Sequence, residues 1–418
     1  MHKVVLISST VAITAAMFGQ GLRLEDLERM ALDRHPAIHQ AAASVRMAQG
    51  KRVQAGLYPN PVLGANGDEI NPGPVTRYGE WGGFIEQRIV TGGKRNLDRG
   101  IAGKKLEEVD SMARAERQRV LNQVRMLYYQ ALADQKLLDV RTELARIAQN
   151  SVRISLELAN VGLADKPDVL AVENELQRVD LSLQMARHAQ ARTWRQLSAA
   201  VNQTLAAQAL TGDIEALPTL DLEQEWARIE KENPDLAAGR TAIERADLSV
   251  RRERVTPVPD IQVRAGLRYN RELLDPGLKP AGMEAFFDVG VEIPIFNRNQ
   301  GNIAAAKAMH ESSRYELERA RLTLRSRLAS AYQEYQDSVA AVARYREEML
   351  PRAEQAHEMY LRNFRQMAAP YPNVLTTQRN LFQVREDHVA ALAMSWKAVV
   401  EIQGLLLGRV SGLPDIQY

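Results

Sequence analysis

The feature that most restricts the fold is an internal repeat. The segments that begin at His35 and at Asn233 align without a gap, and three prolines recur 198 residues later: Pro36 as Pro234, Pro59 as Pro257, and Pro61 as Pro259. Two later pairs of segments align at shifts of 206 and 205 residues. A repeat of this length predicts two similar halves. We place the first structural repeat at residues 21–210 and the second at residues 211–418.

Residues 1–20 have the features of a secretory signal peptide. Lys3 supplies a positive charge, residues 4–17 form an apolar stretch, and small residues follow at which cleavage can occur. The alternative is a buried N-terminal helix, but Gly19 and Gly21 interrupt its pattern. We interpret the segment as a signal peptide, with the exact cleavage position left open, so the mature chain is expected outside the cytoplasm.

Each repeat begins with the same order of predicted elements. A helix starts at Pro36 or Pro234 and runs to a Pro-x-Pro sequence that ends it. Two short segments with strand character follow in each repeat, at residues 62–65 and 83–90 and at residues 261–269 and 285–296. In the last segment, apolar residues alternate with small or polar ones, which is typical of a strand with two different faces. A membrane barrel strand and a soluble hairpin packed on a core both fit this pattern.

Very long helices are predicted after the strands, at residues 94–160 and 300–366. A helix of this length extends about 100 Å and must lie along other helices. The second one carries a heptad seam with steps of four and three residues: Leu324, Leu328, Ala331, Tyr335, Ser338, Val342, Tyr345 and Met349. Residues 168–202 and 373–407 are predicted as return helices. Each repeat then forms an antiparallel helical hairpin whose turn carries Pro167 or Pro372.

The predicted strands constrain the number of subunits. Four strands per chain are too few for a closed membrane barrel, which needs about eight or more because an open edge cannot lie in lipid. If the strands span a membrane, several copies of the chain must share one barrel. A shared barrel carried on long helices describes a duct better than a catalyst.

Composition excludes several function classes. The chain has no cysteine, so disulfides, thiolate metal sites and a lipidated N-terminal cysteine are excluded. Its 54 basic and 52 acidic residues leave a net charge of +2, too little for non-specific nucleic-acid binding. No motif of a hydrolase, metalloprotease or phosphate-binding loop is convincing. We expect no enzyme activity, no cofactor and no resident metal. His35 and His39 have metal-ligand spacing, but Pro36 suggests that His35 precedes the helix, so a metal site there stays open.

Three segments resemble a known family. AGLYPNP at residues 55–61, EQRIVTGGKRNLDRGIA at residues 86–102 and VEIPIFNRNQGNIAAAKA at residues 291–308 are similar to signatures of TolC-like outer membrane factors. The resemblance is to the branch that serves cobalt–zinc–cadmium and nickel–cobalt efflux. It implies mixed α and transmembrane β structure, with helical hairpins forming a periplasmic tunnel. It also implies a homotrimer with a 12-stranded barrel in the outer membrane of a Gram-negative bacterium, four strands coming from each protomer. The implied partners are outer-membrane lipid, a periplasmic adaptor (membrane fusion protein) and a proton-driven inner-membrane cation transporter of the resistance-nodulation-division class.

The same resemblance places adaptor docking and the gate at the hairpin turns. The candidate residues are Gly162, Asp165 and Asp168 in the first repeat and Pro372, Asn373 and Thr376 in the second. Asn373 and Thr376 stand where the family often has acids, so whether an acidic ring exists is left open. Asp168 also fits the N-cap of the return helix.

Pro351 is a candidate helix kink because proline removes a backbone hydrogen bond, and the matching position in the first repeat is Arg146. We hypothesise that it lets the second hairpin lean inward and narrow the tunnel; the alternative is a simple break in the helix.

The expected function is export of cobalt, nickel, zinc or cadmium through the outer membrane. Two alternatives stay open on the sequence alone. One is a duct for drugs or polypeptides, and the other is a periplasmic coiled-coil scaffold without a pore.

Overall fold

The computed structural model describes residues 21–69, 79–162, 165–274, 279–366, 368 and 370–407. The predicted signal peptide at residues 1–20 lies outside the described residues. The chain forms two compact units. One unit contains residues 1–40, 115–233 and 323–418, and the other contains residues 41–114 and 234–322. Each unit therefore draws on both predicted repeats, whose boundary near residue 210 stays a prediction.

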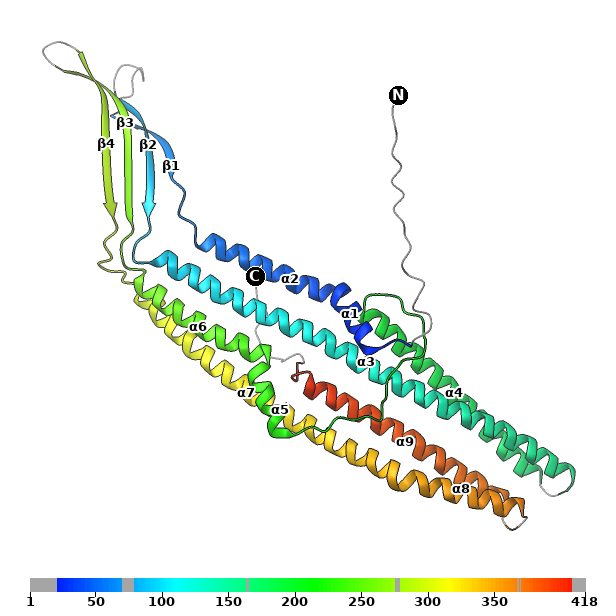
Figure 1. Ribbon diagram of the computed structural model, residues 1–418. Coiled ribbons are helices and arrows are strands. Elements are labelled where there is room, and N and C mark those ends of the chain that lie inside the picture. The colour runs from blue at the N-terminus through cyan, green and yellow to red at the C-terminus, as the bar shows by residue number, and fades with distance from the viewer. Residues whose placement is uncertain are drawn as a thin grey trace, which may run out of the picture. The chain divides into compact units, whose positions relative to one another are not determined.

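Helices make up most of the described chain (Figure 1). In order they are α1 (Leu24–Arg34), α2 (Pro36–Ala55), α3 (Lys94–Asn160), α4 (Lys166–Ala200), α5 (Leu222–Glu232), α6 (Pro234–Val255), α7 (Gln300–Arg344), α8 (Leu350–Arg365) and α9 (Tyr371–Gln403). A π-helical turn, η1 (Tyr345–Met349), separates α7 from α8. None of the described helices combines the length and the apolar composition that crossing a membrane requires.

Four antiparallel strands form one sheet in the order β1-β2-β3-β4. They are β1 (Val62–Asp68), β2 (Glu80–Ile89), β3 (Ile261–Leu274) and β4 (Lys279–Val291). The pairs Ile85 with Ala265 and Ala265 with Phe287 fix the register, so these three residues share a face. The strands of the two repeats thus meet at the β2–β3 pair. This contact joins the repeats within one sheet.

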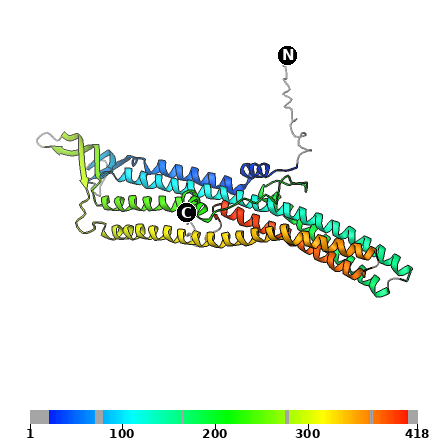
Figure 2. The same cartoon turned by 60° about the horizontal axis from the view of Figure 1, so that its bottom comes forward.

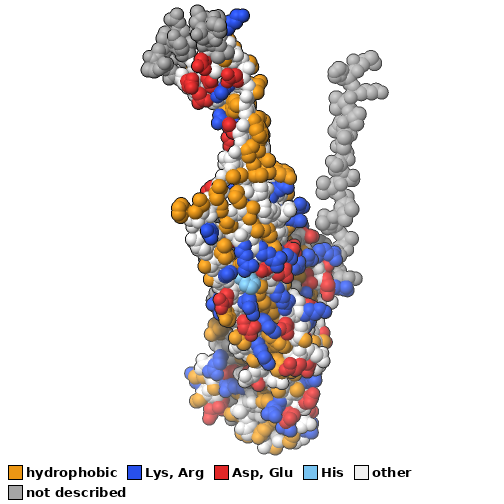
Figure 3. Space-filling view, turned by 90° about the vertical axis from the view of Figure 1, so that its left-hand side faces the viewer, with side chains coloured by type: hydrophobic (Ala, Val, Ile, Leu, Met, Phe, Trp, Pro, Cys, Tyr) orange, Lys and Arg blue, Asp and Glu red, His pale blue; other side chains and the backbone are white. Residues whose placement is uncertain are grey.

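The sheet has one apolar face and one polar face. Figure 3 shows hydrophobic side chains along the strands. The exposed side chains of the apolar face are Leu63, Ile85, Leu267, Met283, Phe287 and Val289. Leu63 is 85% exposed. On the opposite face, Glu86, Arg264 and Asp288 lie side by side across three strands. The alternation within residues 285–291 is therefore the strand pattern that the sequence predicts.

The limits of the strands differ from the prediction. β4 covers residues 279–291 instead of 285–296. Pro294 cannot donate a ladder hydrogen bond, and the three apolar residues around it, Ile293, Ile295 and Phe296, follow the strand in an exposed segment. Conversely, β1 continues through Asn66 and Gly67, which read as a turn in sequence. Pairing with β2 outweighs that local preference, since Gly67 lies opposite Trp81.

A cluster of polar contacts joins the start of α3 to the start of β3. The Asp260 carboxylate accepts hydrogen bonds from Lys94 Nζ at 2.8 Å, from the Thr91 N–H at 3.1 Å and from Arg88 at 2.6 Å. The Lys94 and Asp260 side chains are 8% and 10% exposed. Burial alone raises the pKa of Asp260, but the hydrogen bonds from Lys94, Thr91 and Arg88 outweigh burial and lower this pKa to about 2. These four residues are called the junction cluster below.

In the other unit, the predicted seams form the buried helix faces. Leu324, Leu328, Ala331, Tyr335, Ser338 and Val342 are the buried residues of α7, as the heptad pattern predicts. Two tyrosines, one on α3 and one on α7, also hold residues 211–218, which follow the predicted boundary between the repeats. The Tyr128 hydroxyl donates to the Thr211 carbonyl at 2.6 Å, and the Tyr335 hydroxyl donates to the Pro218 carbonyl at 2.8 Å. The same residue type thus serves the same role on α3 and α7.

We predict that Asp260→Asn lowers the free energy of unfolding by about 3 kcal/mol, because it leaves the buried Lys94 ammonium without its carboxylate. Since the folded pKa of Asp260 is below its unfolded value, the contribution is present above about pH 4 and is lost as the pH falls toward 2. Denaturant unfolding of the detergent-solubilised protein measures the change. Asp247→Asn is the control, because Asp247 forms an exposed ion pair with Arg251 and should contribute less than about 1 kcal/mol. Equal effects of the two substitutions would contradict the assigned role of the junction cluster.

Candidate functional site

The turns of two helical hairpins lie close together in the unit that contains residues 115–233 and 323–418. The first turn joins α3 to α4, and the second joins α8 to α9, as Figure 2 shows for α8 and α9. Gly162 follows α3 with a φ of +75°, a conformation that side chains disfavour. Proline occupies the first turn of both return helices, at Pro167 and Pro372, where its missing N–H costs no hydrogen bond.

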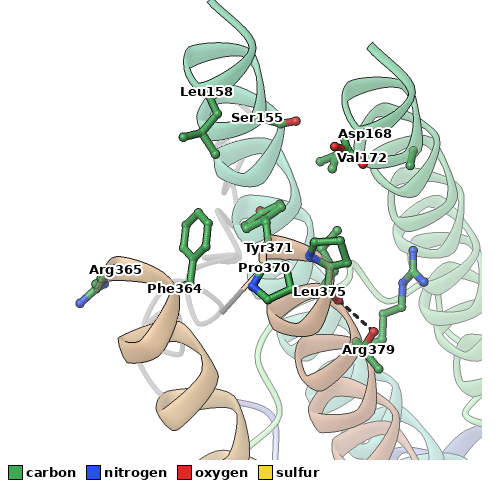
Figure 4. Close-up of a pocket in the computed structure, with 13 residues that line it drawn as sticks. Ser155, Leu158, Asp168, Val172, Phe364, Arg365, Pro370, Tyr371, Leu375 and Arg379 are labelled. Carbon is green, nitrogen blue, oxygen red and sulfur yellow. Dashed lines mark hydrogen bonds between the residues drawn. The ribbon is translucent and has the colours of Figure 1, made fainter. Parts of the chain in front are cut away.

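A cavity of about 670 Å³ lies between the two hairpins (Figure 4). Ser155 and Leu158 of α3 and Val172 of α4 form part of its wall. The second hairpin contributes two aromatic rings, Phe364 and Tyr371, whose centroids are 5.0 Å apart. Burial raises the pKa of Tyr371, so its hydroxyl stays protonated. We call this space the tip cavity.

The tip cavity brings together only some of the predicted site residues. Asp168, Pro372 and Thr376 line it, whereas Gly162, Asp165 and Asn373 do not. The Thr376 hydroxyl donates to the Pro372 carbonyl at 2.9 Å. Asp168 is the one carboxylate among the described lining residues, and it shares the cavity with Arg365 and Arg379. The lining of one protomer is therefore not predominantly acidic.

The predicted position of Asp168 at the helix N-cap is wrong by three residues. α4 begins at Lys166, so Asp165 is the N-cap and Asp168 occupies the third helical position. The Asp168 carboxylate accepts the Asp165 N–H at 3.4 Å, as in a capping box. Asp168 thus stabilises the start of the helix and also faces the tip cavity.

Ion pairs connect α9 to the first hairpin. Arg379 contacts Glu175 of α4 at 2.6 Å, Arg141 of α3 contacts Glu386 at 2.9 Å, and Arg385 contacts Glu143 at 3.0 Å. Sequence reasoning missed these residues and the aromatic pair. The partners in each ion pair are more than 200 residues apart, so no local sequence pattern predicts these contacts. The aromatic pair does have a signal in the sequence, because Phe364 and Tyr371 flank the second turn.

Pro351 follows the π-helical turn η1. The Leu350 N–H donates to the Tyr345 carbonyl, five residues earlier, and Pro351 occupies the start of α8. The extra residue in the π-turn rotates the helix face. As a result, the predicted seam ends at Val342, Met349 is exposed, and the next buried residue is Ala353. The local break at Pro351 is therefore a π-turn; its role in gating stays a prediction.

A second cavity, of about 460 Å³, lies against this π-turn. Arg346 and Leu350 line it together with Lys136, Glu215 and His388. The His388 side chain is only 7% exposed, and its Nε2 lies 3.6 Å from Glu215 Oε2. Burial lowers the pKa of His388; Glu215 opposes this shift, while Lys136 and Arg346 reinforce it. His388 is therefore held neutral at the base of the π-turn.

The structure places His35 and His39 in separate interactions. His35 Nδ1 accepts the Ala37 N–H at 3.2 Å, which caps α2, and a ring nitrogen of His39 lies 3.1 Å from the Asp33 carbonyl. Within the described ranges, no three histidine or carboxylate side chains gather as metal ligands.

Comparison with known proteins agrees with this architecture. The sequence model of the outer membrane efflux protein family matches residues 27–203 and 227–406. The chain belongs to the outer membrane efflux protein family. The two matched segments correspond to the two repeats, which confirms the predicted fold class of paired helical hairpins and a shared four-stranded sheet. Members of this family are efflux channels, so the chain is not an enzyme.

Individual relatives are similar along most of the chain. The cobalt-zinc-cadmium resistance protein CzcC of Cupriavidus metallidurans is 26% identical over 373 residues, which cover 88% of this chain and 85% of CzcC. The structure of CusC aligns with a TM-score of 0.77 at 17% identity and covers 91% of both chains. The outer membrane protein VceC of Vibrio cholerae aligns with a TM-score of 0.75 at 17% identity, covering 92% of this chain and 96% of VceC. The fold of the family is therefore present along nearly the whole described chain.

We predict that acid destabilises this efflux protein through His388. Because burial depresses the folded pKa of His388, the unfolded chain takes up the proton first, and stability falls as the pH drops below the ordinary histidine value of 6.5. Denaturant midpoints measured across this range should fall less steeply for His388→Gln than for the wild type. His188→Gln is the control, since His188 is an exposed residue of α4. An unchanged slope in His388→Gln would contradict the prediction.

Proposed function

We propose that the chain is the outer-membrane channel of a tripartite resistance-nodulation-division efflux system that exports divalent heavy-metal cations. The proposed substrates rest on one observation: the chain is similar to the cobalt-zinc-cadmium resistance protein over 88% of its length. Cobalt, nickel, zinc and cadmium are the proposed substrates. The protein performs no chemistry and lowers the barrier to hydrated ions by offering an aqueous path through the membrane.

The assembly we propose is a homotrimer. Each chain supplies four strands with an apolar face, and three such sheets make about 12 strands, enough to close a membrane barrel.

The signal peptide at residues 1–20 would deliver the chain to the periplasm. A periplasmic adaptor would dock at the hairpin turns, and a proton-driven inner-membrane transporter would supply the energy. Asp168, Pro372 and Thr376 in the tip cavity are the proposed docking and gate residues, with Gly162, Asp165 and Asn373 in the adjoining turns.

Two other functions receive less support. Family membership argues against a coiled-coil scaffold without a pore. A duct for drugs or polypeptides would use the same fold and differs only in cargo, so the cargo test below separates the two.

Growth of a strain that lacks only this gene tests the proposed cargo. We expect hypersensitivity to some of cobalt, nickel, zinc and cadmium, restored by the wild-type gene on a plasmid, and normal tolerance of dyes and detergents. Sensitivity to dyes and detergents with normal metal tolerance would indicate that the channel exports drugs instead of metal cations. The Asp247→Asn gene should complement fully, because it changes only an exposed ion pair.

The ion pair between Arg379 and Glu175 is proposed to keep the two hairpins together in the closed state. The Arg379 side chain is 51% exposed and the Glu175 side chain 13%. A pair that is partly open to solvent contributes about 1 kcal/mol, which corresponds to a roughly fivefold change in the open population. Arg379→Gln should therefore make cells more sensitive to vancomycin, which a closed channel excludes.

Arg178→Gln is the matched control for this test. Arg178 also pairs with Glu175, at 3.2 Å, but both residues belong to α4, so the contact does not join the hairpins. Equal vancomycin sensitivity of the two variants, at equal expression, would refute the proposed closing role of Arg379.

A further inference from the structure

Helix α2 has an unusual charge distribution. Its 20 residues include Arg46, Lys51 and Arg52 and no carboxylate. A charged helix in water ordinarily mixes both signs, because like charges one turn apart repel each other. An uncompensated basic helix suggests that the opposite charge comes from another molecule.

Two arginines on neighbouring helices are held in one groove by a reciprocal arrangement. α2 and α3 run side by side in opposite directions (Figures 1 and 2). Arg52 lies over Gly103 of α3, with its Nε 3.7 Å from the point where a Gly103 side chain would begin. Arg99 of α3 lies over Gly56, just beyond α2, with its Cδ 3.4 Å from the corresponding point. In both cases the sequence is Arg-x-x-x-Gly, so each of the two segments contributes one arginine and one glycine.

The resulting space is a groove of about 380 Å³, here called the basic groove. Its described lining residues are Gln49, Arg52, Val53, Gly56, Arg99 and Leu106, without a carboxylate. Neither Arg52 nor Arg99 forms an ion pair with any described residue, and both are exposed. Two guanidinium groups that line one groove repel each other, and an anion between them removes this cost. Phosphate suits the forked geometry of arginine because it accepts two parallel hydrogen bonds.

The basic groove adjoins exposed apolar side chains. Val53 is 66% exposed and forms part of its wall. The chain then continues through Leu57 and Tyr58, which are 53% and 70% exposed, to Leu63 on the apolar face of the sheet. The Arg95 guanidinium lies 3.3 Å from the centre of the Tyr58 ring. Cations beside an exposed apolar surface match a ligand with a phosphate headgroup and acyl chains.

We propose that the basic groove binds the phosphate of a membrane phospholipid, with Arg52 and Arg99 as its ligands and with the acyl chains lying over Val53, Leu57 and Tyr58. The inference rests on the proposed outer-membrane location. It adds a lipid site that fixes the depth of the helices relative to the membrane surface.

Native mass spectrometry of the detergent-purified, full-length assembly tests this site. The probe is phosphatidylglycerol, compared with diacylglycerol, which has the chains but no phosphate, and with inorganic phosphate. We expect the wild type to retain phosphatidylglycerol and R52Q/R99Q to bind it about tenfold more weakly. The control R187Q/R192Q removes two exposed arginines from α4 and should bind like the wild type. If R52Q/R99Q fails to assemble, R52K/R99K is tested in its place. Weaker binding is again expected, because lysine lacks the forked guanidinium donors that bind a phosphate with two hydrogen bonds.

Several outcomes would overturn the proposal. Equal retention by R52Q/R99Q and the wild type would exclude these arginines as ligands. Equal binding of diacylglycerol would show that phosphate is not recognised, and full displacement of the lipid by millimolar inorganic phosphate would indicate a simple anion site. Loss of assembly in both arginine variants without lipid retention by the wild type would point to a contact between subunits instead. Failure of lipid binding in a protein that is found in outer membranes overturns only this inference, whereas absence from outer membranes overturns the proposed function.

Discussion

The exposed backbone edges of the sheet are the constraint on which the rest of the structure depends. β1 and β4 each have one neighbour in the described sheet, so each offers a row of unpaired N–H and C=O groups. The same sheet presents a face of exposed apolar side chains, of which Leu63 and Phe287 are examples. Lipid would cover the apolar face but cannot satisfy the edges. Pairing of β1 with β4 of another copy would satisfy the hydrogen-bonding groups at both edges and leave the apolar face to the lipid. We therefore propose a shared barrel.

The duplicated sequence supplies what such an assembly needs within each chain. The β2–β3 pair joins the repeats in one sheet, and the junction cluster fixes the start of α3 against the start of β3 through the buried Lys94 and Asp260. In the other unit, the hydroxyls of Tyr128 and Tyr335 donate to the carbonyls of Thr211 and Pro218, just after the predicted boundary between the repeats. The repeats differ at the π-turn before Pro351 and in the charges near the hairpin turns. Only the charge differences lie at the proposed gate; the π-turn lies further along the second hairpin, between α7 and α8.

Periodic features could be predicted from the sequence, and contacts between distant residues could not. The seam from Leu324 to Val342 follows from heptad spacing, because burial on a helix repeats with its turn. The seam fails beyond Val342 because a π-turn inserts one residue, and a proline signals a break without specifying its geometry. The sequence predicts too late an end for β4, because the apolar alternation continues past Pro294 while ladder pairing stops at Val291. Asp168 was identified as a candidate, but the cavity that it shares with Tyr371 and Arg379 arises only from tertiary packing.

Disulfide cross-linking between copies is the most direct test of the shared barrel. The chain has no cysteine, so introduced pairs react without background. Ala65→Cys in β1 would be combined in turn with Ala285→Cys and with Val289→Cys in β4. Within one chain these positions are separated by two strands, about 14 Å, which is too far for a disulfide. The account predicts covalent dimers and trimers after oxidation of at least one pair in outer membranes, and none from the single variants. Monomers alone from every pair, in a protein that is folded and present in outer membranes, would contradict it.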